Sequence, residues 1–129
     1  MKNILLAMTM VLSTLAASAS SAQEVIGSYV AYVGYADLFN SKGQRLTEPW
    51  QVLRQERANY HRFNIRQQGD EWDPFFGSIE NRAAMEQMVI SGWIDPVAAN
   101  GLVNGNVFVF VEIWGSGNRG DYVRVSVGN

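Results

Sequence analysis

Three stretches of this chain are rich in apolar and β-branched residues and predict its strands. Residues 25–38 (VIGSYVAYVGYADL) are apolar on both alternating faces, which predicts a strand covered on both sides over much of its length. Residues 107–114 (VFVFVEIW) are similar apart from Glu112 and predict an interior strand. In residues 122–127 valines alternate with polar residues, which predicts a half-solvated strand in a hairpin with the preceding one. Residues 44–46 could add a short returning strand.

Apolar residues at helical spacing predict two helices between these strands. The first is expected at residues 48–64, because Thr47-Glu48-Pro49 is a typical helix start and the apolar residues after it fall on one face. The second is expected at residues 78–90, and Ser91-Gly92 ends it. Three dipeptides typical of turns then follow before the next strand: Asp95-Pro96, Asn100-Gly101 and Asn104-Gly105.

The order of these elements indicates the fold class. One or more strands are followed by two helices and then by two strands, which is typical of an α+β domain. We expect a small antiparallel sheet of about four strands with the two helices packed on one face. The length of residues 23–129 suits a single globular domain.

Residues 1–22 have the organisation of a cleavable secretory signal peptide. A short cationic start, Met1-Lys2-Asn3, precedes the apolar run at residues 4–15, and small residues with two possible peptidase sites follow. Twelve apolar residues rise only about 18 Å as a helix, against a hydrocarbon core of roughly 30 Å, which favours cleavage over anchoring. We therefore expect a bacterial protein that is periplasmic or secreted, without a membrane span after cleavage.

Composition narrows the classes of function. Of the 129 residues, 47% are hydrophobic and 17% are charged, so a folded domain is expected rather than a disordered chain. The net charge of −2 gives no support for binding to nucleic acid. The chain contains no cysteine, so it forms no disulfide and its stability depends on packing.

Residues 115–120 (GSGNRG) match the G-x-G-x-x-G fingerprint of dinucleotide-binding folds. That fingerprint holds a pyrophosphate at the N-terminus of the helix that follows the glycines. Here a predicted strand follows instead. We therefore interpret the glycines as turn residues of a hairpin, and we expect no cofactor.

Basic residues are concentrated on the first predicted helix. Four arginines lie within residues 54–66, next to the single histidine, His61. On a helical wheel Arg54, Arg57 and His61 fall within about 60° of one another, on the side shared with Trp50. Arginine offers a planar fork of donors to a carboxylate or phosphate, so these four residues are the candidate ligand-binding group.

Asp70, Glu71 and Asp73 lie in the loop expected at residues 66–77 and offer the arginines internal partners. Three cationic side chains on one helix face repel each other, so we expect at least one arginine to bond to this loop. The same carboxylates are candidate metal ligands, for calcium in particular, although the spacing of an EF-hand loop is absent. With His61, one of them could also form the acid–base pair of a small hydrolase.

These observations favour a non-enzymatic, exported binding domain whose partner is a small anionic ligand or a protein that contacts the first helix. No residue is assigned a catalytic role, because cysteine and a G-x-S-x-G motif are both absent. The alternatives are the hydrolase centred on His61 and a structural protein of the cell envelope. The sequence does not indicate an oligomeric state.

Overall fold

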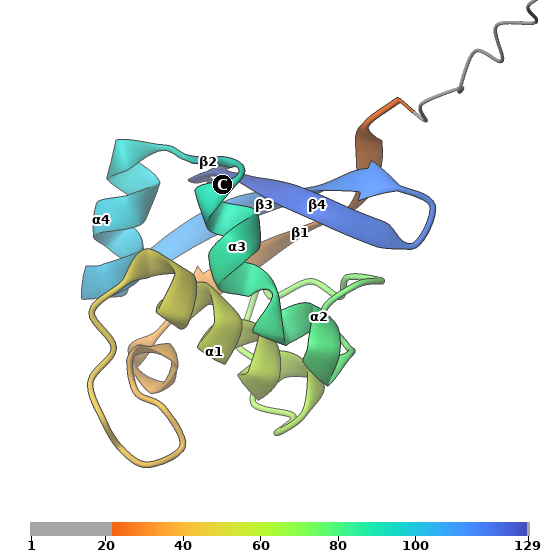
Figure 1. Cartoon of the computed structure of the whole chain (residues 1–129). Helices are drawn as coiled ribbons and strands as arrows, with labels where there is room; N and C mark the ends of the chain where they lie inside the picture. The colour runs from red at the N-terminus through yellow and green to blue at the C-terminus, as the bar shows by residue number, and fades with distance from the viewer. Residues whose placement is uncertain (1–21, 129) are drawn as a thin grey trace, which may run out of the picture.

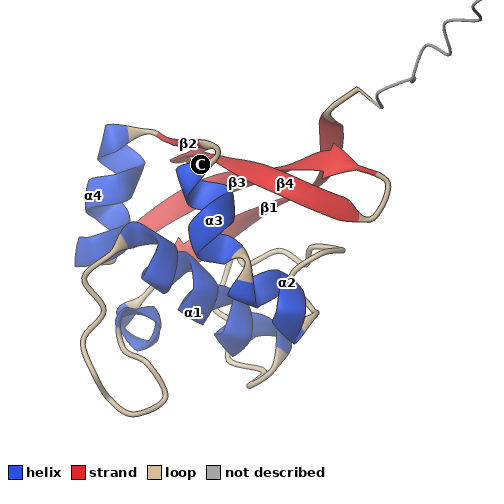
Figure 2. Ribbon diagram, viewed as in Figure 1, coloured by secondary structure: helices blue, strands red, loops and turns tan. Residues whose placement is uncertain are grey.

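A mixed four-stranded sheet with the strand order β1-β3-β4-β2 forms one layer of the structure, and the helices lie against one of its faces (Figures 1 and 2). The structure, a computed structural model, describes residues 22–128, so the predicted signal peptide falls outside the described residues except for its last residue. The α+β class is confirmed. The strands are β1 (Glu24–Val33), β2 (Trp93–Ile94), β3 (Val107–Ser116) and β4 (Arg119–Val127).

The strand β3 is interior, as predicted, because it pairs antiparallel with β1 on one side and with β4 on the other. Its side chains Val109, Val111 and Ile113 point to the helices and are fully buried. Side chains on the opposite face, such as Phe108, keep part of their surface in solvent. The expectation that β1 is covered on both sides is therefore wrong over much of its length, since the helices of residues 22–128 cover only one face of the sheet.

The sheet is mixed, and the prediction of a wholly antiparallel sheet is wrong in this respect. The two-residue strand β2 pairs with β4 in parallel, and the chain between them contains a helix and β3 rather than a hairpin turn. The first strand also ends earlier than predicted, at Val33, and a 3-10 helix, η1 (Tyr35–Leu38), follows it. The possible strand at residues 44–46 is reduced to a single β-bridge between Phe39 and Arg45.

Both predicted helices form, with shorter limits. The first is α1 (Pro49–His61), which has Pro49 in its first turn and Glu48 as its N-cap. The second is broken at Ala84 into α2 (Ile79–Ala83) and α3 (Met85–Ile90), and the Ser78 hydroxyl caps α2 by accepting from the Asn81 N–H. Figure 1 shows η1 on one side of α1 and α2 on the other.

A further helix, α4 (Pro96–Asn104), occupies the region where turns were predicted. The Asp95 carboxylate caps it by accepting from the N–H groups of Val97 and Ala98, so Asp95-Pro96 is a helix start here. Gly101 lies inside this helix, at a position where a Cβ would lie only 2.8 Å from a methyl group of Val107. Close packing of α4 on β3 therefore requires a glycine at position 101, although the dipeptide Asn100-Gly101 by itself suggested a turn.

The glycines of residues 115–120 belong to the hairpin between β3 and β4, which confirms their interpretation as structural residues. Gly117 adopts a φ of 58° at the turn. A Cβ on Gly115 would lie 1.8 Å from the carbonyl oxygen of Arg119 on the neighbouring strand. Within residues 22–128, no helix is long and apolar enough to cross a bilayer.

Candidate functional site

The helix α1 presents different charged residues to the core and to solvent. Arg57 faces the core and has no exposed surface. Its Nε and Nη2 donate to the two carboxylate oxygens of Glu56 at 2.6 and 2.7 Å, and its Nη1 donates to Asp73 Oδ1 at 2.9 Å. The guanidinium also lies over the ring of Tyr29, 3.8 Å from the centroid. Arg57 is therefore fully engaged by internal partners.

Asp73 fixes the following loop to α1. Its Oδ1 also lies 2.7 Å from His61 Nε2, and its Oδ2 accepts from the backbone N–H groups of Phe75 and Phe76. Burial by itself would raise the pKa of Asp73, but the Phe76 N–H and the His61 and Arg57 side chains outweigh it and hold the pKa below its ordinary value. The expected charge-assisted bond between an arginine of α1 and this loop is thus present.

Glu56 is the polar residue among the apolar positions of α1, and it is buried with Arg57. Burial raises its pKa to about 7, although the hydrogen bonds and positive charge of Arg57 act in the opposite direction. The ion pair therefore lies in a region of low polarity, where it joins α1 to the sheet and to the loop.

The two other acidic residues of the loop face β1. Asp70 Oδ1 accepts from the Tyr32 N–H at 2.8 Å, and Glu71 Oε1 accepts from the Val30 N–H at 2.7 Å. These carboxylates cover backbone donors on the free edge of β1, a common protection for an edge strand. The three acids thus bond to different partners. Residues 22–128 contain no group of three or more metal-ligating side chains close enough to hold a metal ion.

The structure separates the candidate ligand-binding residues Arg54, Arg57, His61 and Trp50. Arg57 and His61 meet at Asp73, whereas Arg54 lies on the exposed side of α1 with its guanidinium 5.0 Å from the ring centroid of Trp50. In residues 22–128, the only hydrogen-bond partner of the His61 ring is Asp73. This is half of a serine-hydrolase arrangement, and the described hydrogen bonds join no hydroxyl group to it.

Arg54 lines a cavity of about 240 Å³ between α1 and α2. Positions 54, 58 and 62 follow one another at intervals of four on α1, so they share one face of the helix. That face meets α2, from which Arg82 enters the same cavity. The complete lining is Arg54, Gln55, Ala58, Arg62, Ile79, Arg82 and Ala83, and we call this cavity the arginine pocket.

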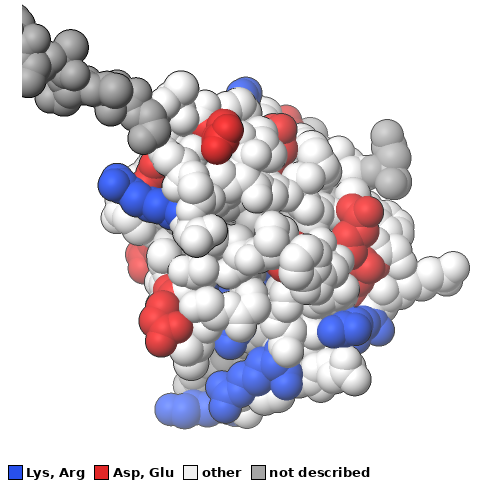
Figure 3. Space-filling model, turned by 90° about the vertical axis from the view of Figure 1, so that its right-hand side faces the viewer, with Lys and Arg blue, Asp and Glu red and all other residues white. Residues whose placement is uncertain are grey.

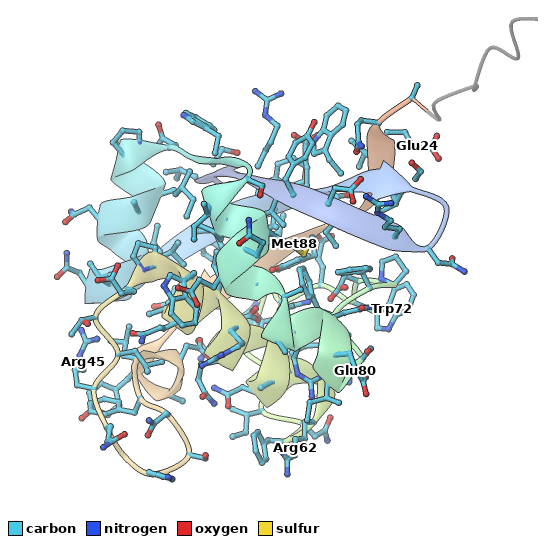
Figure 4. The ribbon with its side chains drawn as sticks, in the orientation of Figure 1. Glu24, Arg45, Arg62, Trp72, Glu80 and Met88 are labelled. Carbon is cyan, nitrogen blue, oxygen red and sulfur yellow. The ribbon has the colours of Figure 1, made fainter. Side chains whose placement is uncertain are left out.

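The three arginines of the pocket are held differently. Arg82 is buried, and its Nη1 donates to the carbonyl oxygens of Phe76 and Gly77 at 2.9 and 3.1 Å. Arg54 and Arg62 are exposed, and Figure 4 shows Arg62 at the lower edge of the molecule. In the described part of the chain, no carboxylate lies within 4.0 Å of any of the three guanidinium groups. Figure 3 shows a group of basic side chains along this lower edge.

Glu80 is the acidic residue of α2, and it is fully exposed. Its pKa is lowered chiefly by a backbone N–H and by the Ser78 hydroxyl, and only to a smaller extent by Arg82. The Ser78 Oγ donates to Glu80 at 2.9 Å, so this carboxylate is engaged at the start of α2. Among residues 22–128, the positive charge of the arginine pocket therefore has no acidic partner at ion-pair distance.

Sequence reasoning missed Arg62 and Arg82. The signal for Arg62 was present, because it follows Arg54 by two steps of four residues on the same helix. No comparable signal existed for Arg82, since only the tertiary structure brings α2 against α1.

Neither a protein-family model, nor a curated protein, nor a solved structure significantly matches this chain.

Proposed function

We propose that this protein is an exported, non-enzymatic binding domain that holds an anionic group in the arginine pocket. The observation that carries this proposal is the convergence of Arg54, Arg62 and Arg82 on one cavity, with no carboxylate within 4.0 Å of them in residues 22–128. Like charges that share a cavity repel each other, and an anion between them removes the repulsion.

Two features of the pocket support binding rather than simple solvation of the charges. The carbonyl oxygens of Phe76 and Gly77 orient the Arg82 guanidinium, and the ring of Trp50 orients that of Arg54. Such preorganisation reduces the conformational entropy that binding would otherwise cost. The planar donors of arginine suit carboxylate, phosphate and sulfate groups. A cavity of about 240 Å³ suits one such group better than a large ligand.

Inorganic phosphate provides a direct test. Bound phosphate should raise the thermal unfolding midpoint of residues 23–129 with increasing concentration, because a ligand that binds only the native state stabilises it. The double variant Arg54→Gln and Arg62→Gln should lose most of this rise. Arg119→Gln combined with Arg124→Gln is the matched control, since both arginines are exposed on β4 and this double change removes the same two positive charges elsewhere on the surface.

An equal phosphate effect in the double variant and in the native sequence would contradict the proposal. So would an equal loss in the Arg119→Gln and Arg124→Gln control, because it would indicate a response to net charge rather than a site. Export is tested separately, by mass spectrometry of the mature protein. The expected first residue is Ser20 or Gln23, and recovery of residues 4–15 in the mature chain would overturn this part of the proposal.

A further inference from the structure

A second cavity adjoins α1 and shares Gln55 with the arginine pocket, and its surface is mostly apolar. It measures about 280 Å³ and is formed by η1, the loop after η1, α1 and the segment after α1. At its rim, Tyr35, Phe63 and Ile65 are 78%, 43% and 46% exposed. The full lining is Tyr35, Ala36, Phe39, Asn40, Ser41, Gln55, Asn59, Phe63 and Ile65, and we call it the apolar pocket.

The polar groups at the base of this pocket are already satisfied. The Gln55 Nε2 donates to Asn59 Oδ1 at 2.9 Å, and Asn59 Nδ2 donates to the buried Asp37 Oδ1 at 2.8 Å. A polar ligand would therefore gain little there, whereas an apolar group would release water from the exposed rings. The chemistry of the pocket favours a hydrocarbon or aromatic group.

The two pockets lie next to each other along α1 and share the side chain of Gln55. Arg54 and Ala58 on α1, with Arg62 at its C-cap, face the arginine pocket. Gln55 and Asn59 on α1, with Phe63 just after the helix, face the apolar pocket. Gln55 lines both cavities, and the Arg62 guanidinium lies 5.0 Å from the ring centroid of Phe63. One molecule with a charged end and an apolar end could thus occupy both pockets across Gln55.

We propose that the ligand of this protein is an anionic amphiphile, bound as a single molecule, with its acidic group in the arginine pocket and its apolar part in the apolar pocket. This inference rests on the proposed function, because it assigns the anion of the arginine pocket to the head of a larger molecule. The charge of Arg54, Arg62 and Arg82 selects the head, and the exposed rings select the tail.

Isothermal titration calorimetry with three probes tests this assignment: inorganic phosphate, octyl phosphate below its critical micelle concentration, and octanol. Octyl phosphate should bind at least about tenfold more tightly than inorganic phosphate, a gain that burial of two or three methylene groups supplies. Octanol should bind much more weakly than octyl phosphate, since it lacks the charged head.

A variant of the apolar pocket separates the two contributions. Tyr35→Gln combined with Ile65→Gln should remove the advantage of octyl phosphate and leave the affinity for inorganic phosphate unchanged, because neither residue lines the arginine pocket. Both side chains are partly exposed at the rim, so the fold tolerates the change, and a thermal unfolding curve checks it. Ile90→Gln, 68% exposed on α3 and outside both pockets, is the matched control and should retain the full advantage.

The outcomes distinguish this inference from the proposed function. If phosphate binds and octyl phosphate binds no more tightly, the amphiphile inference is wrong and the anion site stands. If the advantage of octyl phosphate persists in the Tyr35 and Ile65 variant, or if octanol binds as tightly as octyl phosphate, the two pockets do not hold one molecule as proposed. If neither phosphate nor octyl phosphate binds, both proposals fail.

Discussion

The Nη1 atom of Arg57 lies 2.9 Å from Oδ1 of Asp73, and both side chains are withdrawn from solvent. This ion pair joins the middle of α1 to the loop that leads to α2. The bidentate bond to Glu56 makes Arg57 the centre of a buried network with two carboxylates. The network positions α1, and α1 in turn presents one row of residues to each of the two pockets.

Replacement of Arg57 by Met should destabilise the fold severely. The change leaves the Glu56 and Asp73 carboxylates buried without their cationic partner, and loss of one member of a buried ion pair costs roughly 3–5 kcal/mol. Urea denaturation measures the change in the free energy of unfolding. Arg124→Met on the exposed face of the sheet is the control and should change it by less than about 0.5 kcal/mol. Similar values for the two variants would show that the buried network contributes little.

The stability of the protein should fall as the pH rises through neutrality, because of Glu56. Burial raises the pKa of this carboxyl from 4.5 to about 7, so the native state binds the proton more tightly than the unfolded chain does. The resulting stability is fully present below about pH 4.5 and is lost as the pH rises through about 7.

Glu56→Gln tests this pH dependence, since its side chain cannot ionise. Between pH 5 and pH 8, urea denaturation should show a loss of unfolding free energy in the native sequence that exceeds the loss in the variant by on the order of 1–3 kcal/mol. Asp37, whose pKa burial also raises, is present in both proteins and does not affect the comparison. Parallel pH profiles would show that Glu56 stays ionised throughout.

The edge of β1 should become less protected when the carboxylates that cover it are removed. Asp70→Ala combined with Glu71→Ala removes the acceptors of the Tyr32 and Val30 N–H groups. Hydrogen exchange at these two amides should accelerate roughly fivefold per hydrogen bond, the equivalent of about 1 kcal/mol. Glu86→Ala, an exposed acid on α3, is the control. Unchanged exchange at both amides would mean that the carboxylates do not protect the edge.

Two valines that are partners in the sheet should respond differently to the same truncation. Val109 on β3 is fully buried, whereas Val127, its partner on β4, is 44% exposed. Val109→Ala should lower the free energy of unfolding by roughly 2–4 kcal/mol, because it leaves a cavity in the core. Val127→Ala should cost less than about 1 kcal/mol. Equal costs in denaturant unfolding would show that the burial of Val109 does not determine its contribution.

Local patterns in the sequence were sufficient for the class of the fold and for its main elements. A run of apolar residues identified β3, and alternation of valines with polar residues identified β4. Pro49 and the apolar face of the residues after it identified α1, because these features act within one element. The glycines between β3 and β4 were recognised as turn residues for the same reason. Asp95-Pro96 begins α4, but Gly101 argued against a helix in the sequence. The reason for this glycine is a close contact with Val107 on β3, which the sequence does not reveal.

Only the tertiary structure decided which charges meet. A helical wheel placed Arg54, Arg57 and His61 on one side of α1, but it contains no information on what lies opposite each residue. The loop that follows brings Asp73 to Arg57, so this arginine is buried, while Arg54 stays at the surface beside Arg62. Arg82 joins them from α2, which is distant in sequence. Charge pairing acts through space over a few ångströms, so the sequence determined the helix that bears the arginines, and the folded chain determined which of them form an ion pair within residues 22–128.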